Sequence, residues 1–75
     1  MTLEDIFENG PTIQGNICIS LFDGEEKVED KYFHDADNLS FEAGWLLEYW
    51  GDFEVTYMYV GKFGWLHIEL QKEKD

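Results

Sequence analysis

Arginine is absent from this 75-residue chain, and its strong cations are limited to five lysines. Arginine is the residue best suited to hold phosphate through two parallel hydrogen bonds, so its absence argues against direct binding of nucleic acid. Seventeen acidic residues outnumber the lysines and give a formal net charge of −12. A surface of this charge repels nucleic acid and anionic membranes, and it attracts basic partners, including proteins that handle nucleic acid.

Cysteine and long apolar runs are scarce as well. Cys18 is the only cysteine, so no disulfide can form within the chain. The first residues are acidic where a secretory signal would be basic, and no apolar run approaches the length that spans a membrane. These features predict a cytoplasmic protein.

The sequence also lacks a catalytic or ligand-binding motif. The segment 34–38 alternates oxygen ligands, but a calcium loop would need a third ligand at Leu39 and a glycine at Ser40. Cys18 as a nucleophile would need a nearby histidine and an electropositive setting, and His34 and His67 lie in other segments. We therefore expect a protein that is not an enzyme and has no cofactor and no bound metal.

Large aromatic residues are abundant, and most of them lie in the segment 39–70. Residues 53–60 and 65–71 alternate with the period of half-buried strands, and two glycines in 61–64 suit a tight connection between them. We expect an apolar face on which three pairs oppose each other: Val55 with Leu70, Tyr57 with Ile68, and Tyr59 with Leu66. The polar face would then hold Glu54, Thr56, Met58, His67, Glu69 and Gln71.

A helix of about three turns is predicted over residues 41–50, with Ser40 as its N-cap and Gly51 just beyond its end. One stripe suits packing against the hairpin: Leu39, Ala43, Leu46, Leu47 and Trp50. A second stripe on another side consists of Phe41, Trp45 and Tyr49. An ordinary core is the favoured interpretation of this second stripe, and a surface for a partner is the alternative.

The N-terminal half predicts a short helix and a second hairpin. Residues 2–9 form a helix capped by Thr2, with Leu3, Ile6 and Phe7 pointing inward. A strand with Ile13, Ile17, Ile19 and Leu21 on one face follows, then a turn at Asp23-Gly24 and an edge strand over 27–33 that charge protects. The expected fold is one α+β domain over residues 1–75: a small antiparallel sheet of two β-hairpins covered by one main helix, with a short N-terminal helix.

Two features are candidate binding residues. Seven carboxylates gather on the turn, the edge strand and the loop after it: Asp23, Glu25, Glu26, Glu29, Asp30, Asp35 and Asp37. Carboxylates two apart on one strand face lie roughly 6.5 to 7 Å apart, similar to successive phosphates, so this run could imitate nucleic acid. The alternative is that the run serves solubility and protects the strand edge. Phe63 and Trp65, at the hairpin tip, are candidate anchors for a partner.

In size, acidity and lack of arginine the chain resembles the small accessory and inhibitor proteins of phages and mobile elements, among them anti-CRISPR proteins. The resemblance rests on no motif and implies no role for any residue. The sequence predicts a non-catalytic, acidic binding or inhibitor protein of the nucleic-acid-mimic type, whose partner is a basic protein that handles nucleic acid. The alternative is a homodimeric or hetero-oligomeric interaction module that uses aromatic surface.

Overall fold

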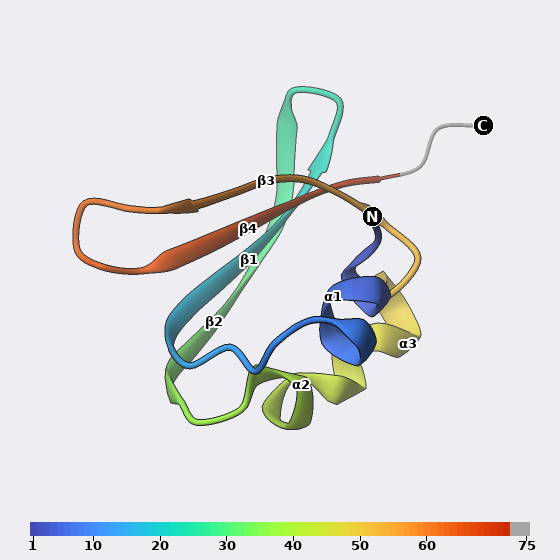
Figure 1. The fold of residues 1–75 in the computed structure, drawn as a ribbon. Coiled ribbons are helices and arrows are strands. Elements are labelled where there is room, and N and C mark those ends of the chain that lie inside the picture. The colour runs from blue at the N-terminus through green and yellow to red at the C-terminus, as the bar shows by residue number, and fades with distance from the viewer. Residues whose placement is uncertain (73–75) are drawn as a thin grey trace.

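The computed structural model describes residues 1–72 (Figure 1). The strands are β1 (Gly15–Asp23), β2 (Glu26–Ala36), β3 (Glu54–Val60) and β4 (Leu66–Gln71). The helices are α1 (Leu3–Asn9), α2 (Leu39–Glu42), the 3₁₀ turn η1 (Gly44–Leu46) and α3 (Leu47–Trp50). Within residues 1–72, each helix is too short to cross a membrane.

The described strands form one mixed sheet in the order β2-β1-β4-β3. The β1–β2 and β3–β4 hairpins are antiparallel, as predicted, but they join through a parallel pair in which Ile19 of β1 lies beside Ile68 of β4. The prediction of an antiparallel sheet is therefore wrong. In Figure 1 the turns of the two hairpins lie toward different ends of the sheet, because β1 and β4 run parallel while β1 ends at its turn and β4 begins at its turn.

The prediction of one main covering helix is also wrong. The segment breaks at Ala43, whose φ of −111° and ψ of 14° end α2, and it continues as η1 and α3. Gly44 follows the break, and glycine is less favourable than alanine inside a helix by about 1 kcal/mol. The N-cap is Asn38 rather than Ser40, since the Asn38 side chain accepts a hydrogen bond from the N–H of Phe41. The Ser40 hydroxyl instead donates to the carbonyl of Phe7 at 2.9 Å.

Helix α1 matches its prediction. The Thr2 side chain accepts from the N–H of Asp5, and the Asp5 carboxylate accepts from the N–H of Thr2, which forms a capping box. This backbone hydrogen bond lowers the pKa of Asp5. The predicted inward residues Leu3, Ile6 and Phe7 are buried.

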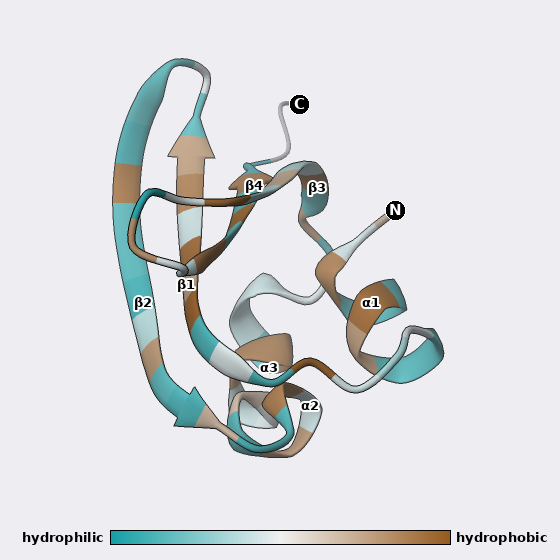
Figure 2. Cartoon of the chain, turned by 60° about the vertical axis from the view of Figure 1, so that its left-hand side comes forward, coloured by the Kyte–Doolittle hydropathy of each residue, from teal (hydrophilic) through white to brown (hydrophobic). Residues whose placement is uncertain are grey.

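The core lies between the helices and one face of the sheet, and Figures 1 and 2 show α1, α2 and α3 gathered on the same side. The predicted helical stripe is confirmed: four of its residues are buried and Leu47 is partly buried against them. The buried apolar cluster consists of Leu3, Ile6, Phe7, Ile17, Ile19, Leu21, Ala36, Leu39, Ala43, Leu46, Trp50, Ile68 and Leu70.

The β3–β4 register departs from the prediction at one residue. Val55 opposes Leu70, as expected, but an irregularity between Val55 and Tyr57 shifts the pairing by one. From there the opposed pairs are Tyr57–Glu69, Met58–Ile68, Tyr59–His67 and Val60–Leu66. Because side chains alternate with a period of two, this bulge turns Tyr57 and Tyr59 away from the core and Met58 toward it. The predicted apolar face is therefore confirmed at Val55 and at Leu66, Ile68 and Leu70 of β4, and it is wrong at Tyr57 and Tyr59.

Candidate functional site

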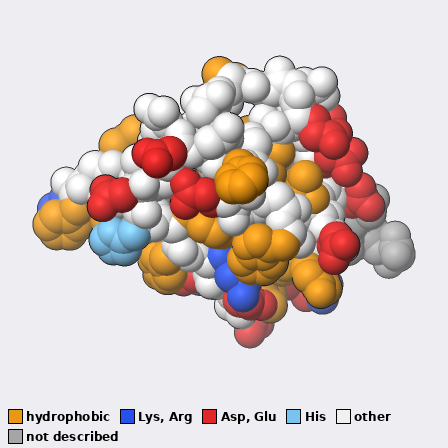
Figure 3. All heavy atoms as spheres, turned by 90° about the horizontal axis from the view of Figure 1, so that it is seen from below, with side chains coloured by type: hydrophobic (Ala, Val, Ile, Leu, Met, Phe, Trp, Pro, Cys, Tyr) orange, Lys and Arg blue, Asp and Glu red, His pale blue; other side chains and the backbone are white. Residues whose placement is uncertain are grey.

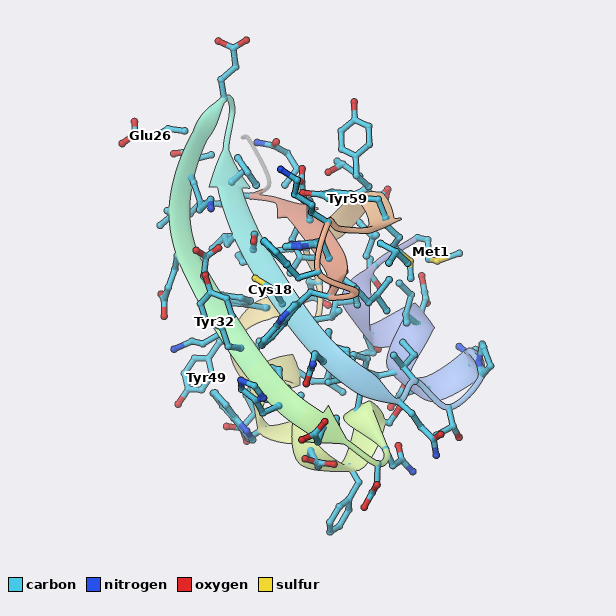
Figure 4. All side chains as sticks on the ribbon, turned by 90° about the vertical axis from the view of Figure 1, so that its left-hand side faces the viewer. Met1, Cys18, Glu26, Tyr32, Tyr49 and Tyr59 are labelled. Atoms are coloured by element: carbon cyan, nitrogen blue, oxygen red, sulfur yellow. The ribbon has the colours of Figure 1, made fainter. Side chains whose placement is uncertain are left out.

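The face of the sheet turned away from the helices, here called the open face, is covered by none of the helices in residues 1–72. Figure 4 looks toward this side and shows Cys18 between Tyr32 of β2 and Tyr59 of β3. One row of side chains crosses all four strands: Tyr32, Cys18, His67 and Tyr59. The next row consists of Asp30, Ser20, Glu69 and Tyr57. The open face thus combines aromatic rings with carboxylates.

Asp30 is held in place by a hydrogen-bond network. The buried Ser20 hydroxyl donates to Asp30 Oδ1 at 2.7 Å, while Lys27 Nζ at 3.4 Å and the Tyr32 hydroxyl at 3.3 Å donate to Oδ2. Burial by itself would raise the pKa of Asp30, but the hydrogen bonds from Ser20 and Lys27 outweigh it and lower the pKa. The charge of Asp30 in turn raises the pKa of Tyr32. Asp30 is therefore a carboxylate at neutral pH, and Tyr32 is a neutral donor.

Glu69 forms a second tyrosine–carboxylate pair on the neighbouring strands. The Tyr59 hydroxyl donates to Glu69 Oε2 at 2.7 Å, and this hydrogen bond raises the pKa of Tyr59. The Tyr59 ring also stacks on His67, with centroids 4.9 Å apart and planes inclined by 9°. The ring of Tyr59 is therefore held in place beside a negative charge.

A hollow of about 690 Å³ opens on the same face, between the β1–β2 turn and the bulge of β3. Glu25 and Glu69 contribute carboxylates to its lining, and Tyr57, which is 65% exposed, contributes an aromatic ring. Carboxylates next to aromatic rings suit a guanidinium or ammonium group, which can form an ion pair and a cation–π contact together. The open face is therefore suited to bind cationic side chains.

Trp65 joins the aromatic set of the open face instead of projecting from the hairpin tip. Its ring meets Tyr32 edge-on at 5.8 Å and His34 edge-on at 5.0 Å, and Trp65 is half-buried. Phe63, the other predicted anchor, is 86% exposed in the β3–β4 turn. The structure separates these two residues, since only Trp65 packs against β2.

The seven predicted acidic residues do not form one row. Glu25 lines the hollow of the open face, and Asp30 lies beside it on the same face. Asp23 and Glu26 oppose each other at the β1–β2 turn. Asp35 and Asp37 line a separate hollow of about 360 Å³ at the other end of β2.

The middle of β2 does not show the spacing expected of a phosphate mimic. Glu29 and Asp30 are adjacent, so they point to opposite faces of the sheet. Each also has a lysine partner, since Lys31 Nζ lies 2.6 Å from Glu29 and Lys27 Nζ lies 3.4 Å from Asp30. Two of the seven carboxylates are thus partly neutralised by the same strand.

The second helical stripe is exposed, so its interpretation as core is wrong. Phe41 is 83% exposed, Trp45 52% and Tyr49 70%. Figure 3 shows apolar side chains on this end of the molecule, interspersed with carboxylates. Lys31 Nζ lies 5.8 Å from the centre of the Trp45 ring, so a cation of the chain itself already occupies part of this surface.

Cys18 lies beside His67 in the parallel pair, a proximity that sequence separation concealed. The thiol is buried, and its Sγ lies 3.6 Å from the Ser20 hydroxyl. Within residues 1–72, no three histidine, cysteine, aspartate or glutamate side chains are placed to hold a metal ion.

Compared with known proteins, the chain matches no family model, no curated protein and no solved structure. Sequence reasoning named Glu25, Asp30 and Trp65 among the residues that meet on the open face, but it missed Tyr32, Tyr59 and Glu69 as a binding set. Their signal is weak: Tyr59 follows Tyr57 by two residues in one strand, Glu69 lies in the strand that pairs with it, and Tyr32 lies in a different strand.

Proposed function

We propose that this is a non-catalytic binding protein that holds a basic segment of a partner protein on the open face of its sheet. The observation that carries the proposal is the pair of tyrosine–carboxylate contacts, Tyr32 with Asp30 and Tyr59 with Glu69. Each contact sets a negative charge beside an aromatic ring, which is the combination that attracts lysine and arginine side chains.

The charge of the whole chain supports the same proposal. A net charge of −12 steers basic partners toward the protein over distances of about the Debye length, roughly 10 Å at moderate salt. Proteins that handle nucleic acid carry exposed lysines and arginines for phosphate contacts, so they are the proposed class of partner. Occupying those cations would keep nucleic acid away, which makes this protein an inhibitor of its partner in the cytoplasm.

The open face is a better binding surface for cations than the edge of β2, because more of its carboxylates lack a lysine partner. On the opposite face of β2, Glu29 already has a lysine partner in Lys31, and on the open face Asp30 shares its charge with Lys27. No lysine within residues 1–72 forms a salt bridge with Glu25 or Glu69. The charges of Glu25 and Glu69 on the open face are therefore available to cations from outside.

The test uses a flexible peptide of alternating arginine and glycine as the probe, titrated at low and at high salt. The double variant Asp30→Asn, Glu69→Gln removes both carboxylates of the tyrosine pairs. The matched control, Glu4→Gln with Glu8→Gln, changes the net charge equally on exposed positions of α1. We expect binding to weaken with salt, the double variant to lose roughly tenfold to thirtyfold in affinity, and the control to lose less than roughly twofold.

Equal losses in the two double variants would contradict the proposal, since they would reflect diffuse attraction instead of a site on the open face. Binding that ignores salt would contradict the role of charge. Because Asp30→Asn disturbs the hydrogen bond to the buried Ser20, Glu69→Gln alone provides a second variant, and circular dichroism verifies that each variant is folded.

A second candidate is an interaction module that associates through aromatic surface, either with itself or with another protein. The exposure of Phe41, Trp45 and Tyr49 favours it. Sedimentation equilibrium over a range of concentrations tests self-association. A dimer that dissociates in Phe41→Ser with Tyr49→Ser would support this candidate, and a monomer at high concentration and high salt would remove the homodimer.

A further inference from the structure

Within residues 1–72, the outer edge of β3 is covered along its first half only. The N–H of Val55 donates to the carbonyl of Met1 at 2.8 Å, and the N–H of Leu3 donates to the carbonyl of Phe53 at 3.2 Å. Thr2 forms an isolated bridge with Glu54 between these two bonds. Beyond the bulge, the stretch from Tyr57 to Val60 pairs with β4 alone among the strands of residues 1–72.

The hairpin turn determines which backbone groups of β3 face outward. The N–H of Gly61 donates to the carbonyl of Trp65 at 2.7 Å, so the backbone groups of Gly61 point toward β4. Backbone groups alternate between the two sides of a strand, so those of Tyr59 also point toward β4. The N–H and C=O groups of Met58 and Val60 therefore point away from the sheet, where another strand could pair with them.

This stretch lacks the usual protection of an edge strand. Natural edges carry charge, proline, a bulge or a covering segment, because a bare edge recruits other strands, and the bulge of β3 lies before this stretch. The stretch from Tyr57 to Val60 contains none of these, and its side chains are 46% to 71% exposed. An exposed apolar stretch of this kind is typical of an interaction site.

A hollow lies below the same edge, on the helix side of the sheet. Its volume is about 580 Å³, and its lining is mainly apolar, with Ile6, Pro11, Ile13 and Met58 among its residues. A strand added to β3 would direct alternate side chains toward this hollow and the side chains between them toward Tyr57 and Tyr59 on the open face.

We infer that the β3 edge binds an extended segment of a partner by strand addition, with apolar residues facing the hollow and lysine or arginine residues facing the open face. This inference rests on the proposed function for the basic character of the partner and adds the binding mode. Charge complementarity selects this occupant over a second copy of the chain. Two copies would bring together two net charges of −12, and the β3 stretch from Tyr57 to Val60 offers no cation to the open face.

The test uses a short peptide in which valine and lysine alternate, with a peptide of the same composition in two blocks as its control. Val60→Pro removes an N–H that the sheet itself does not use, whereas Val60→Thr retains this N–H and a β-branched side chain. We expect the alternating peptide to bind the wild type and Val60→Thr within roughly twofold, and to bind Val60→Pro at least roughly tenfold more weakly. Hydrogen exchange of the Met58 and Val60 amides should slow when the alternating peptide binds, and the block peptide should bind more weakly.

Equal affinities of Val60→Pro and Val60→Thr would overturn strand addition, as would unchanged exchange at Met58 or the absence of binding by the alternating peptide. A wild-type dimer that Val60→Pro dissociates would identify a second copy as the occupant and would also overturn the inference. If Val60→Pro fails to fold, methylation of alternate backbone nitrogens of the peptide removes the same hydrogen bonds from the other side. The double variant Asp30→Asn, Glu69→Gln could lose binding of the arginine–glycine peptide while Val60→Pro binds both peptides fully. This result would leave the proposed function intact and refute strand addition alone.

Discussion

The two edge strands, β2 and β3, both expose backbone groups along one side, but they differ in how those groups are protected. Six of the eleven residues of β2 are charged, against one of the seven in β3, so charge deters strand addition only at β2. Figure 2 shows that β2 is hydrophilic along most of its length. The first half of β3 is instead covered by the N-terminal residues.

The stretch from Tyr57 to Val60 is therefore a local exception among the sheet edges. Charge protects the edge of β2, and the N-terminal residues cover the first half of the β3 edge. Neither device protects the rest of the β3 edge, which lies between the open face and the apolar hollow. An exception placed between two hollows is consistent with a binding role, since an exposed apolar edge otherwise promotes aggregation.

The largest effect is expected at the covering segment of β3. Leu3→Ala removes a fully buried side chain that anchors α1, and we expect the free energy of unfolding to fall by about 2 to 4 kcal/mol. The total for a domain of this size is roughly 4 to 11 kcal/mol. Urea denaturation measures the loss, and Val28→Ala on the exposed edge of β2 is the control, with an expected loss below about 1 kcal/mol. Equal losses of stability in Leu3→Ala and Val28→Ala would show that the segment covering β3 stabilises the fold no more than the exposed edge of β2 does.

A smaller effect is expected where β2 is attached to β1. Ser20→Ala removes the hydrogen bond to the Asp30 carboxylate, and we expect a loss of about 1 to 2 kcal/mol at neutral pH. The pKa of Asp30 lies below its ordinary value of 3.8 in the folded protein. Its carboxylate therefore stabilises the fold above that value, and the contribution is lost as pH falls through the folded pKa.

The difference between the wild type and Ser20→Ala should accordingly shrink when unfolding is measured below pH 3.8. Ser40→Ala is the matched control, because its hydroxyl donates to the neutral carbonyl of Phe7 and its effect should not follow pH. A Ser20→Ala difference that is constant with pH would show that the charge of Asp30 does not strengthen the contact.

The smallest effect on stability is expected when the same positive charge is placed on each edge strand. Val60→Lys on β3 and Val28→Lys on β2 replace exposed valines, so each should change the free energy of unfolding by less than about 0.5 kcal/mol. We expect Val60→Lys to reduce aggregation on heating, measured by light scattering, far more than Val28→Lys does. Equal reductions would mean that the two edges are equally protected.

Elements with local signals were predictable from the sequence. The cap at Thr2, the acidic first turn and the spacing of Leu3, Ile6 and Phe7 correctly predicted α1. The turn at Gly24, which adopts a positive φ of 69°, was predictable because glycine accepts this conformation. The break of the long helix had its signal in Gly44, which helical periodicity outweighed in the prediction.

The candidate site was less predictable, because it depends on contacts between distant segments. Ser20 lies between Asp30 and Glu69 only because β1 pairs with both β2 and β4. Tyr59 meets Glu69 only because one extra residue in β3 changes the face of both tyrosines. A pattern of alternating residues predicts a strand but contains no information on a bulge within it.

The negative charge, the two hairpins, the first helix and the buried stripe of the second helical segment follow from the amino-acid order alone. These features depend on residues a few positions apart, where periodicity, capping and turn preferences act directly. The parallel pairing of β1 with β4, the bulge in β3 and the contacts between tyrosines and carboxylates on the open face emerge only in the folded chain. Those features depend on which distant strands pair and in which register, and a shift of one residue exchanges the two faces of a strand.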